Sequence, residues 1–276
     1  MHFLKKIFNF YILSNIHVAI SGFCMTKISL LKINNYEDVT PLFVALSIII
    51  SYNFIRFYEA KVGKVVWFKD WFAAYKYAFY LINILSIVGL ITLVFFTEFN
   101  LQSLVVLIPF GIMTFFYAIP ILKIKNVEVS FRNFPFIKIF SIAFAWAGVT
   151  VIFPQTALGL EFKTTNYLEF IQRFFILLAI ILPFDIRDIK YDLKKLKTLP
   201  QVVGVPKSKV LGIVFILFFV VLELLKTENY FFSTFIIGVI TGMFLLFSSE
   251  KKLNYYASFW VEAIPIYWLV IILLNV

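Results

Sequence analysis

The residues best suited to chemistry follow the sixth apolar run of this chain of 276 residues. Three aspartates, Asp185, Asp188 and Asp192, stand in the stretch PFDIRDIKYD. If a helix continues through them, their i, i+3, i+7 spacing places them on one face. Such close like charges repel unless a cation lies among them, and Mg²⁺ binds one or two protein carboxylates together with water or phosphate oxygens. The spacing therefore predicts that these three aspartates are magnesium ligands.

A second interpretation of the same acids needs no ligand. They would then stand on a solvated helix end and form ion pairs with nearby cations, namely Arg187, Lys190, Lys194 and Lys195. Exposed ion pairs of this kind contribute little to stability. The three aspartates alone leave both interpretations open.

Composition decides which elements must position these acids. The chain is 62% hydrophobic and 14% charged, against roughly 45–50% and 25% in soluble domains. Continuous apolar runs, each long enough to cross a bilayer, fall near 8–31, 39–58, 74–97, 101–121, 136–154, 168–184, 209–226, 230–248 and 256–275. We expect an all-α bundle of about nine transmembrane helices, in one domain covering residues 1–276. A β-barrel is excluded, because the runs do not alternate polar and apolar residues.

Charge gives the expected orientation of the bundle. The N-terminus and the connections after runs 2, 4, 6 and 8 hold or border 20 of the 25 Lys and Arg residues. Such a bias indicates a cytoplasmic side, so we expect a cytoplasmic N-terminus, cytoplasmic loops near 59–73, 122–135 and 185–208, and the C-terminus opposite. The net charge of +10 accompanies no nucleic-acid recognition motif. Lipid is the expected surrounding, nucleic acid is not an expected partner, and the oligomeric state is left open.

The residues after the acids carry a more specific pattern. Asp188 and Asp192 are followed by Lys195, then by Thr198-Leu199-Pro200, and then by Gly204. This stretch resembles the second aspartate motif of the UbiA family of intramembrane prenyltransferases, in which D-x3-D precedes a basic linker, T-L-P and a glycine.

A second segment resembles the same family. Tyr117 and Lys123, with Pro120 between them, are similar to its tyrosine, proline and lysine segment, although their separation is six residues rather than four. The expected nine helices, with polar cytoplasmic loops after runs 2 and 6, are also similar to the family architecture.

The resemblance implies a fold, a substrate and a reaction. A central cavity open to lipid binds a polyprenyl diphosphate, whose diphosphate is held by Mg²⁺ between two aspartate motifs. Diphosphate departs, and the allylic carbocation alkylates a lipophilic acceptor such as an aromatic ring or a quinone precursor. In these terms Asp188 and Asp192 are catalytic, and Tyr117, Lys123 and Lys195 bind substrate.

The family's first motif, N-x3-D-x3-D, is incomplete in this chain. Asn53 matches the leading asparagine and is expected to bind substrate, but Phe57 and Lys61 occupy the two aspartate positions. Without those carboxylates a second Mg²⁺ lacks protein ligands, so clamping by two metal ions is disfavoured.

Arg56 lies one helical turn beyond Asn53 and suggests a replacement for the two missing carboxylates. Its guanidinium fork is suited to two oxygens of a diphosphate, so we expect it to bind substrate. Alternatively it forms an ion pair with Asp185 or Asp188 across the mouth of the cavity, which would fix two helices without any ligand.

Three functions remain open at this stage. The first is a UbiA-like prenyltransferase. The second keeps the fold without catalysis and binds an isoprenoid or another lipid, and the incomplete first motif supports it. The third is a small membrane transporter, because acids within membrane segments can mark ion routes.

Overall fold

The computed structural model describes residues 2–61, 66–96, 99, 101–119, 122–124, 127–129, 135–189, 198–226, 230–252 and 255–275. In the first half of the chain it contains α1 (His2–Leu13), α2 (Ile16–Leu31), α3 (Val39–Lys61), α4 (Val66–Phe96) and α5 (Leu101–Ala118). A small antiparallel hairpin follows, made of β1 (Leu122–Ile124) and β2 (Val127–Val129). It lies within the predicted 122–135 connection.

In the second half, the regular elements of the described residues are all helices. This half contains α6 (Pro135–Ala147), a π-helical turn (Gly148–Ile152), α7 (Phe153–Ala157), α8 (Thr164–Asp188), α9 (Leu199–Val203), α10 (Val205–Glu223), α11 (Phe231–Phe247), a second π-helical turn (Tyr256–Val261) and α12 (Ile264–Asn275). The prediction of an all-α bundle is therefore confirmed in class, with the hairpin as a minor addition.

Each of the nine predicted runs coincides with helix in the described residues. In the part of the chain that the structure describes, six segments are long and apolar enough to cross a membrane, and α1 with α2 make a seventh if that bent pair counts as one span. The remaining two runs form shorter apolar helices, at 101–117 and 231–247. Several long apolar helices of this kind are typical of a multi-pass membrane protein.

The first predicted run is not one straight helix. It breaks at Ser14 and Asn15, where α1 and α2 meet at 58°. Asn15 has φ 63° and ψ 17°, in the left-handed region that asparagine tolerates better than most residues. Both residues are buried, so their polar groups lie inside the bundle rather than in lipid.

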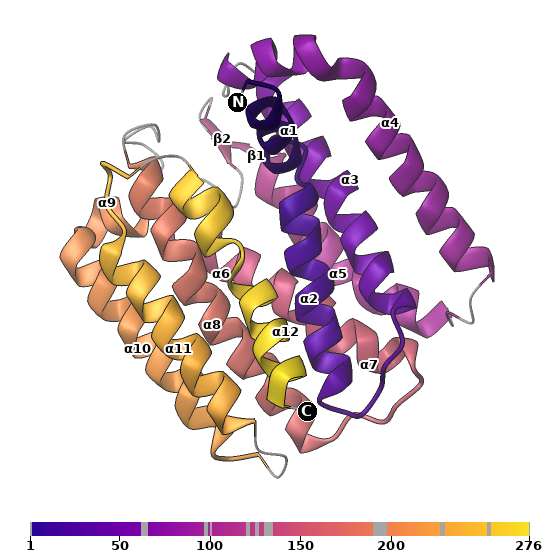
Figure 1. Cartoon of the computed structure of the whole chain (residues 1–276), viewed down its shortest axis with the longest axis vertical. Helices are drawn as coiled ribbons and strands as arrows, with labels where there is room; N and C mark the ends of the chain where they lie inside the picture. The colour runs from indigo at the N-terminus through magenta and orange to yellow at the C-terminus, as the bar shows by residue number, and fades with distance from the viewer. Residues whose placement is uncertain are drawn as a thin grey trace.

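The arrangement of the helices explains which faces are apolar. Figure 1 shows α2 and α12 in the middle, α8, α10 and α11 on one side, and α3, α4 and α5 on the other. The core between them is built around α8, where Ile176, Leu178 and Leu182 are fully buried. In the apolar segment of α4 only 11% of the residues are buried, and exposed apolar side chains occur along its length. A helix so weakly covered by protein is suited to contact with lipid.

Helices extend into the predicted loops. Helix α3 reaches Lys61 and α4 starts at Val66, so most of the predicted 59–73 connection is helical in its described part. Helix α8 reaches Asp188, while 190–197 lie outside the described residues. The two chain ends lie at opposite ends of the bundle (Figure 1).

Candidate functional site

The interior of the bundle contains a central cavity made of three adjoining hollows. The polar lobe, of about 270 Å³, is bordered by Asn15, Arg56, Tyr117, Arg187, Ser258 and Glu262. The acidic lobe, of about 220 Å³, is bordered by Lys138, Asp185 and Asp188, and it shares Tyr117 and Glu262 with the polar lobe. The apolar lobe, of about 310 Å³, lies between α3, α5 and α6, and its wall includes Phe43, Leu107 and Phe110.

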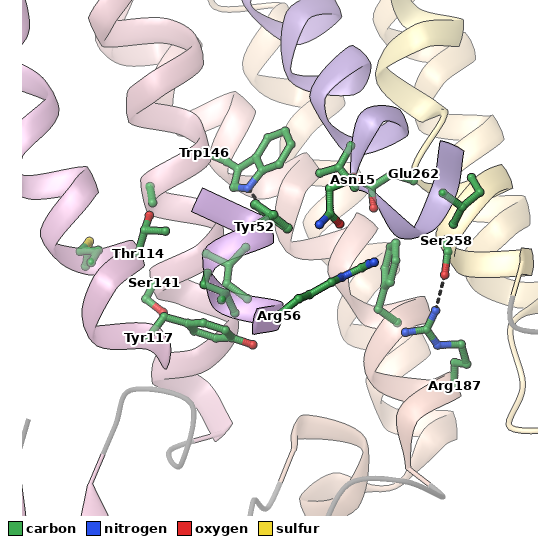
Figure 2. A pocket seen from close by; sticks show the side chains of 17 residues that line it. Asn15, Tyr52, Arg56, Thr114, Tyr117, Ser141, Trp146, Arg187, Ser258 and Glu262 are labelled. Atoms are coloured by element: carbon green, nitrogen blue, oxygen red, sulfur yellow. Dashed lines mark hydrogen bonds between the residues drawn. The ribbon is translucent and has the colours of Figure 1, made fainter. Parts of the chain in front are cut away.

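Two arginines reach the polar lobe from different helices. Arg56 comes from α3 and Arg187 from the last turn of α8. Figure 2 shows the Arg56 side chain extended into the hollow beneath Asn15, with Arg187 beyond it. Arg187 Nη1 donates a 2.6 Å hydrogen bond to the hydroxyl of Ser258. Two guanidinium groups on one hollow make an arrangement suited to phosphate or carboxylate oxygens.

Arg56 also fastens the bend between α1 and α2. Its Nη1 donates a 2.6 Å hydrogen bond to the carbonyl of Leu13, the last residue of α1. The last carbonyls of a helix lack partners within it, so this contact satisfies one of them. Among the described residues, neither Asp185 nor Asp188 is an ion-pair partner of Arg56. The contact with the bend leaves other guanidinium N–H groups available to a ligand.

Asn53 lies behind the cavity wall. It is 1% exposed. Its Oδ1 accepts a 2.8 Å hydrogen bond from Asn15 Nδ2, and its own Nδ2 donates to Asn83 at 3.4 Å. These amides connect the bend to α3 and α4. The structure therefore gives Asn53 a contact with the bend, and its predicted role in binding substrate stays a prediction.

Asp185 forms a buried ion pair. Its Oδ1 lies 2.6 Å from Nζ of Lys138 on α6, and both side chains are at most 10% exposed. A buried carboxylate is stable in its charged form only when paired in this way. Lys138 therefore already supplies a cation to this predicted magnesium ligand.

Asp188 lies at the edge of the acidic lobe and is more accessible. Its side chain is 31% exposed, and it accepts two hydrogen bonds from Arg187, at 2.6 Å and 2.8 Å. The predicted partners Asp192 and Lys195 lie outside the described residues. Within the described residues, no group of three His, Cys, Asp or Glu side chains could hold a metal ion.

The other predicted residues divide between the cavity and its surroundings. Tyr117 borders both the polar and the acidic lobe. Lys123 belongs to β1, and its side chain lies outside the described part. The T-L-P segment begins the short helix α9, where the Thr198 N–H donates to Gln201 Oε1 at 2.9 Å. Gly204 ends that helix with φ 83°, a conformation that favours glycine.

Lys138 and Glu262 are site residues that sequence reasoning missed. Both stand inside apolar runs, and an ionisable residue there is itself a signal of function. A second signal is visible only in the structure, because the turn Tyr256–Val261, which carries Ser258, is π-helical. Such turns occur frequently at functional sites.

The charges on the cavity balance in number but not in pairing. Three cations, Arg56, Lys138 and Arg187, face three carboxylates, those of Asp185, Asp188 and Glu262. Within the described residues, Arg56 and Glu262 have no ion-pair partner. The Arg56 guanidinium and the Glu262 carboxylate are thus left for a ligand or for each other.

Comparison of the chain with protein-family models, with curated proteins and with solved structures gives no match.

Proposed function

We propose that this chain is a UbiA-like membrane prenyltransferase with about nine spans, whose central cavity binds a polyprenyl diphosphate. The observation that carries the proposal is the position of Arg56, which borders the polar lobe without an ion-pair partner in the described residues. An apolar lobe of about 310 Å³ adjoins it at Tyr52 and Trp146. A charged hollow beside an apolar one is suited to a ligand with an anionic head and a hydrocarbon chain.

Arg56 and Arg187 would bind the head of this ligand. A guanidinium binds two phosphate oxygens through parallel N–H groups, and both arginines border the polar lobe. Arg56 would take the place of the missing carboxylates of the first motif, because a direct cation needs no bridging metal. Asn53 would help to fix the bend that Arg56 contacts, through its hydrogen bond with Asn15.

Asp188 and Asp192 would hold Mg²⁺. The Asp188 carboxylate is 31% exposed, and the metal would take the place of Arg187, from which both of its oxygens accept hydrogen bonds. Asp185 fits less well, since it is 2% exposed and bonded to Lys138. When bound, the metal would neutralise negative charge developing on the departing diphosphate. Lys195, which is close in sequence to Asp192, and Lys123 would add cations at the cytoplasmic mouth.

The proposed transfer would break one bond and form one bond. The C–O bond of the prenyl group breaks, and diphosphate leaves with the electron pair. The allylic carbocation then forms a C–C bond with a lipophilic acceptor, and the acceptor loses a proton. The rings of Tyr52, Tyr117 and Trp146 border the cavity, where cation–π contact stabilises a carbocation. The Glu262 carboxylate borders the same two lobes and would take the proton.

A specific observation favours a second candidate, which binds the lipid without transferring it. Asp185 and Asp188 already have the cationic partners Lys138 and Arg187. Phe57 and Lys61 stand at the aspartate positions of the first motif. A cavity whose acids are internally paired can bind a diphosphate lipid through Arg56 alone.

Titration of the purified protein with radiolabelled polyprenyl diphosphate and Mg²⁺ separates these functions. Turnover with an aromatic acceptor, abolished by Asp188→Ala or Asp192→Ala, supports the transferase. Binding without turnover supports the second candidate. Ion or solute flux in proteoliposomes, without lipid binding, would contradict both and favour a transporter.

A further inference from the structure

A second large hollow lies at the other end of helix α8. This charged chamber, of about 560 Å³, is bordered by Lys32 after α2, by Thr164 and Thr165 at the start of α8, and by Lys226 after α10. The central cavity borders the second half of the same helix, from Leu177 to Asp188. The chamber borders α8 as far as Glu169, and Leu177, the first α8 residue of the central cavity, lies eight residues or roughly 12 Å farther along at 1.5 Å per residue. The two hollows are therefore separate sites.

A buried network of charged side chains adjoins the charged chamber. Four of its members border the chamber and Arg173 lies behind them: Lys32, Glu169, Glu223, Lys226 and Arg173. None has a side chain more than 10% exposed. Glu169 is its centre, because it bonds Lys32 at 3.0 Å, Arg173 at 3.1 Å and also Lys226. Glu169 and Arg173 belong to α8 and Glu223 to α10. Lys32 is the first residue after α2, and Lys226 is the third residue after α10.

Glu223 is held in place by neighbours that carry no charge. Its Oε2 accepts a 2.7 Å hydrogen bond from Gln172 Nε2, and its Oε1 accepts one of 3.0 Å from the N–H of Tyr230. Arg173 donates in the same way to the carbonyl of Met25 at 2.8 Å. The network is thus built into the helix contacts and is not a chance meeting of flexible side chains.

The network contains one more cation than carboxylate. Within the described residues, Lys32, Arg173 and Lys226 face only Glu169 and Glu223, and the electrostatic neighbours of Lys32 there are the other four members. On the exposed rim, Glu161 and Lys163 cancel each other. A buried charge without a counter-charge is costly, so the chamber favours an additional anion.

Two features reduce the cost of the excess positive charge without neutralising it. Lys32 Nζ lies 5.1 Å from the ring centre of Trp268 and 5.7 Å from that of Tyr230, within reach of cation–π attraction. Burial lowers the pKa of Lys32 to about 8. The lysine is therefore still mostly charged at pH 7, and the excess persists there.

We infer that the charged chamber is a second binding site, which takes a small anion with carboxylate or phosphate oxygens. The cations Lys32 and Lys226 border the space, and the hydroxyls of Thr164 and Thr165 add donors. These threonines also begin α8, whose N-terminus favours negative charge. The anion is either a soluble one or the headgroup of an acidic lipid. The inference does not depend on the function proposed for the central cavity.

Binding of inorganic phosphate tests the soluble source. The protein is placed in phosphatidylcholine nanodiscs and carries Arg56→Gln, so that the central cavity contributes less, and its thermal stabilisation by phosphate is titrated. Lys226→Met removes the excess charge and should raise the half-maximal phosphate concentration by about tenfold or more. Glu223→Gln increases the excess and should lower that concentration. Opposite shifts are expected of an anion site, whereas a purely structural network would give no such reversal.

A variant on the exposed rim covers the case in which a buried variant fails to fold. Lys163→Glu reverses one charge at the mouth of the chamber and should weaken phosphate binding, with little effect on stability without phosphate.

For the lipid source, native mass spectrometry compares retention of phosphatidylglycerol by the wild type and by Lys226→Met. Phosphate stabilisation or retained lipid that depends on Lys226 or Lys163 supports the site. If neither ligand responds to either substitution, the inference is wrong.

Discussion

The indole N–H of Trp146 donates a 2.8 Å hydrogen bond to the hydroxyl of Tyr52, from α6 to α3. The rings meet edge to face, with their centres 6.2 Å apart. Both residues border the polar, acidic and apolar lobes of the central cavity. This pair is therefore the wall at which a charged head and a hydrocarbon chain would meet.

Replacement of Trp146 should change both stability and ligand binding. Trp146→Phe removes the donor to Tyr52, which we expect to lower the free energy of unfolding by about 1 kcal/mol, with a further loss from the smaller ring. Binding of a polyprenyl diphosphate should weaken as well. Trp260→Phe is the matched control, because Trp260 is 51% exposed. Equal effects of the two substitutions would contradict the role given to Trp146.

Two substitutions at Asn15 should separate its side-chain bond from its backbone conformation. Asn15→Gly keeps the left-handed conformation easily but loses the hydrogen bond to Asn53. Asn15→Ala loses that bond and also strains the backbone, by roughly 1 kcal/mol. We expect chemical unfolding to rank the wild type above Asn15→Gly, and Asn15→Gly above Asn15→Ala. The reverse order of the two variants would show that the left-handed turn is not needed.

The bend at Asn15 also shows why the fold was easier to predict than the site. Apolar runs depend on composition alone, so every predicted run coincides with helix in the described residues. The break at Ser14 and Asn15 depends on tertiary contacts, above all the bond from Arg56 to the Leu13 carbonyl. No local sequence pattern predicts such a contact, since its two partners are 43 residues apart in the chain.

Only part of the candidate site could be predicted from the sequence. The acids of α8 and Tyr117 were found by spacing and resemblance, and the structure places Asp185, Asp188 and Tyr117 on one lobe. The cation that pairs with Asp185 was missed, because Lys138 is 47 residues away and is a single charge in an apolar run. Single charges in such runs are therefore worth as much attention as motifs.

The ion pair between Lys138 and Asp185 should behave as a unit. Lys138→Gln or Asp185→Asn alone removes one partner of this buried 2.6 Å ion pair, and we expect each to lower the free energy of unfolding by about 3–5 kcal/mol. The double variant leaves two neutral side chains and should lose clearly less than the sum. Unfolding in a double-mutant cycle measures this coupling. Additive losses would mean that the two side chains are not partners.

Gly148 controls the shape of the apolar lobe. A Cβ added there would lie 2.1 Å from the ring of Phe110, which forms part of the lobe. Gly148→Ala should displace this ring, lower stability by about 1–3 kcal/mol, and weaken binding of long prenyl chains more than short ones. Gly242→Ala is the control, since a Cβ there meets only ordinary contacts of 3.7 Å and 3.8 Å and does not border the lobe. The same loss of affinity for every chain length would argue against the apolar lobe as the chain site.

The most direct test of the account is equilibrium binding of a radiolabelled polyprenyl diphosphate to the purified protein in nanodiscs, with and without Mg²⁺. Arg56→Gln and Arg187→Gln should each weaken binding by about tenfold or more, because each removes a guanidinium from the polar lobe. Lys76→Gln, which removes an exposed charge from α4, should leave the affinity unchanged. Affinities of both arginine variants equal to that of the wild type would contradict a diphosphate site between these two residues.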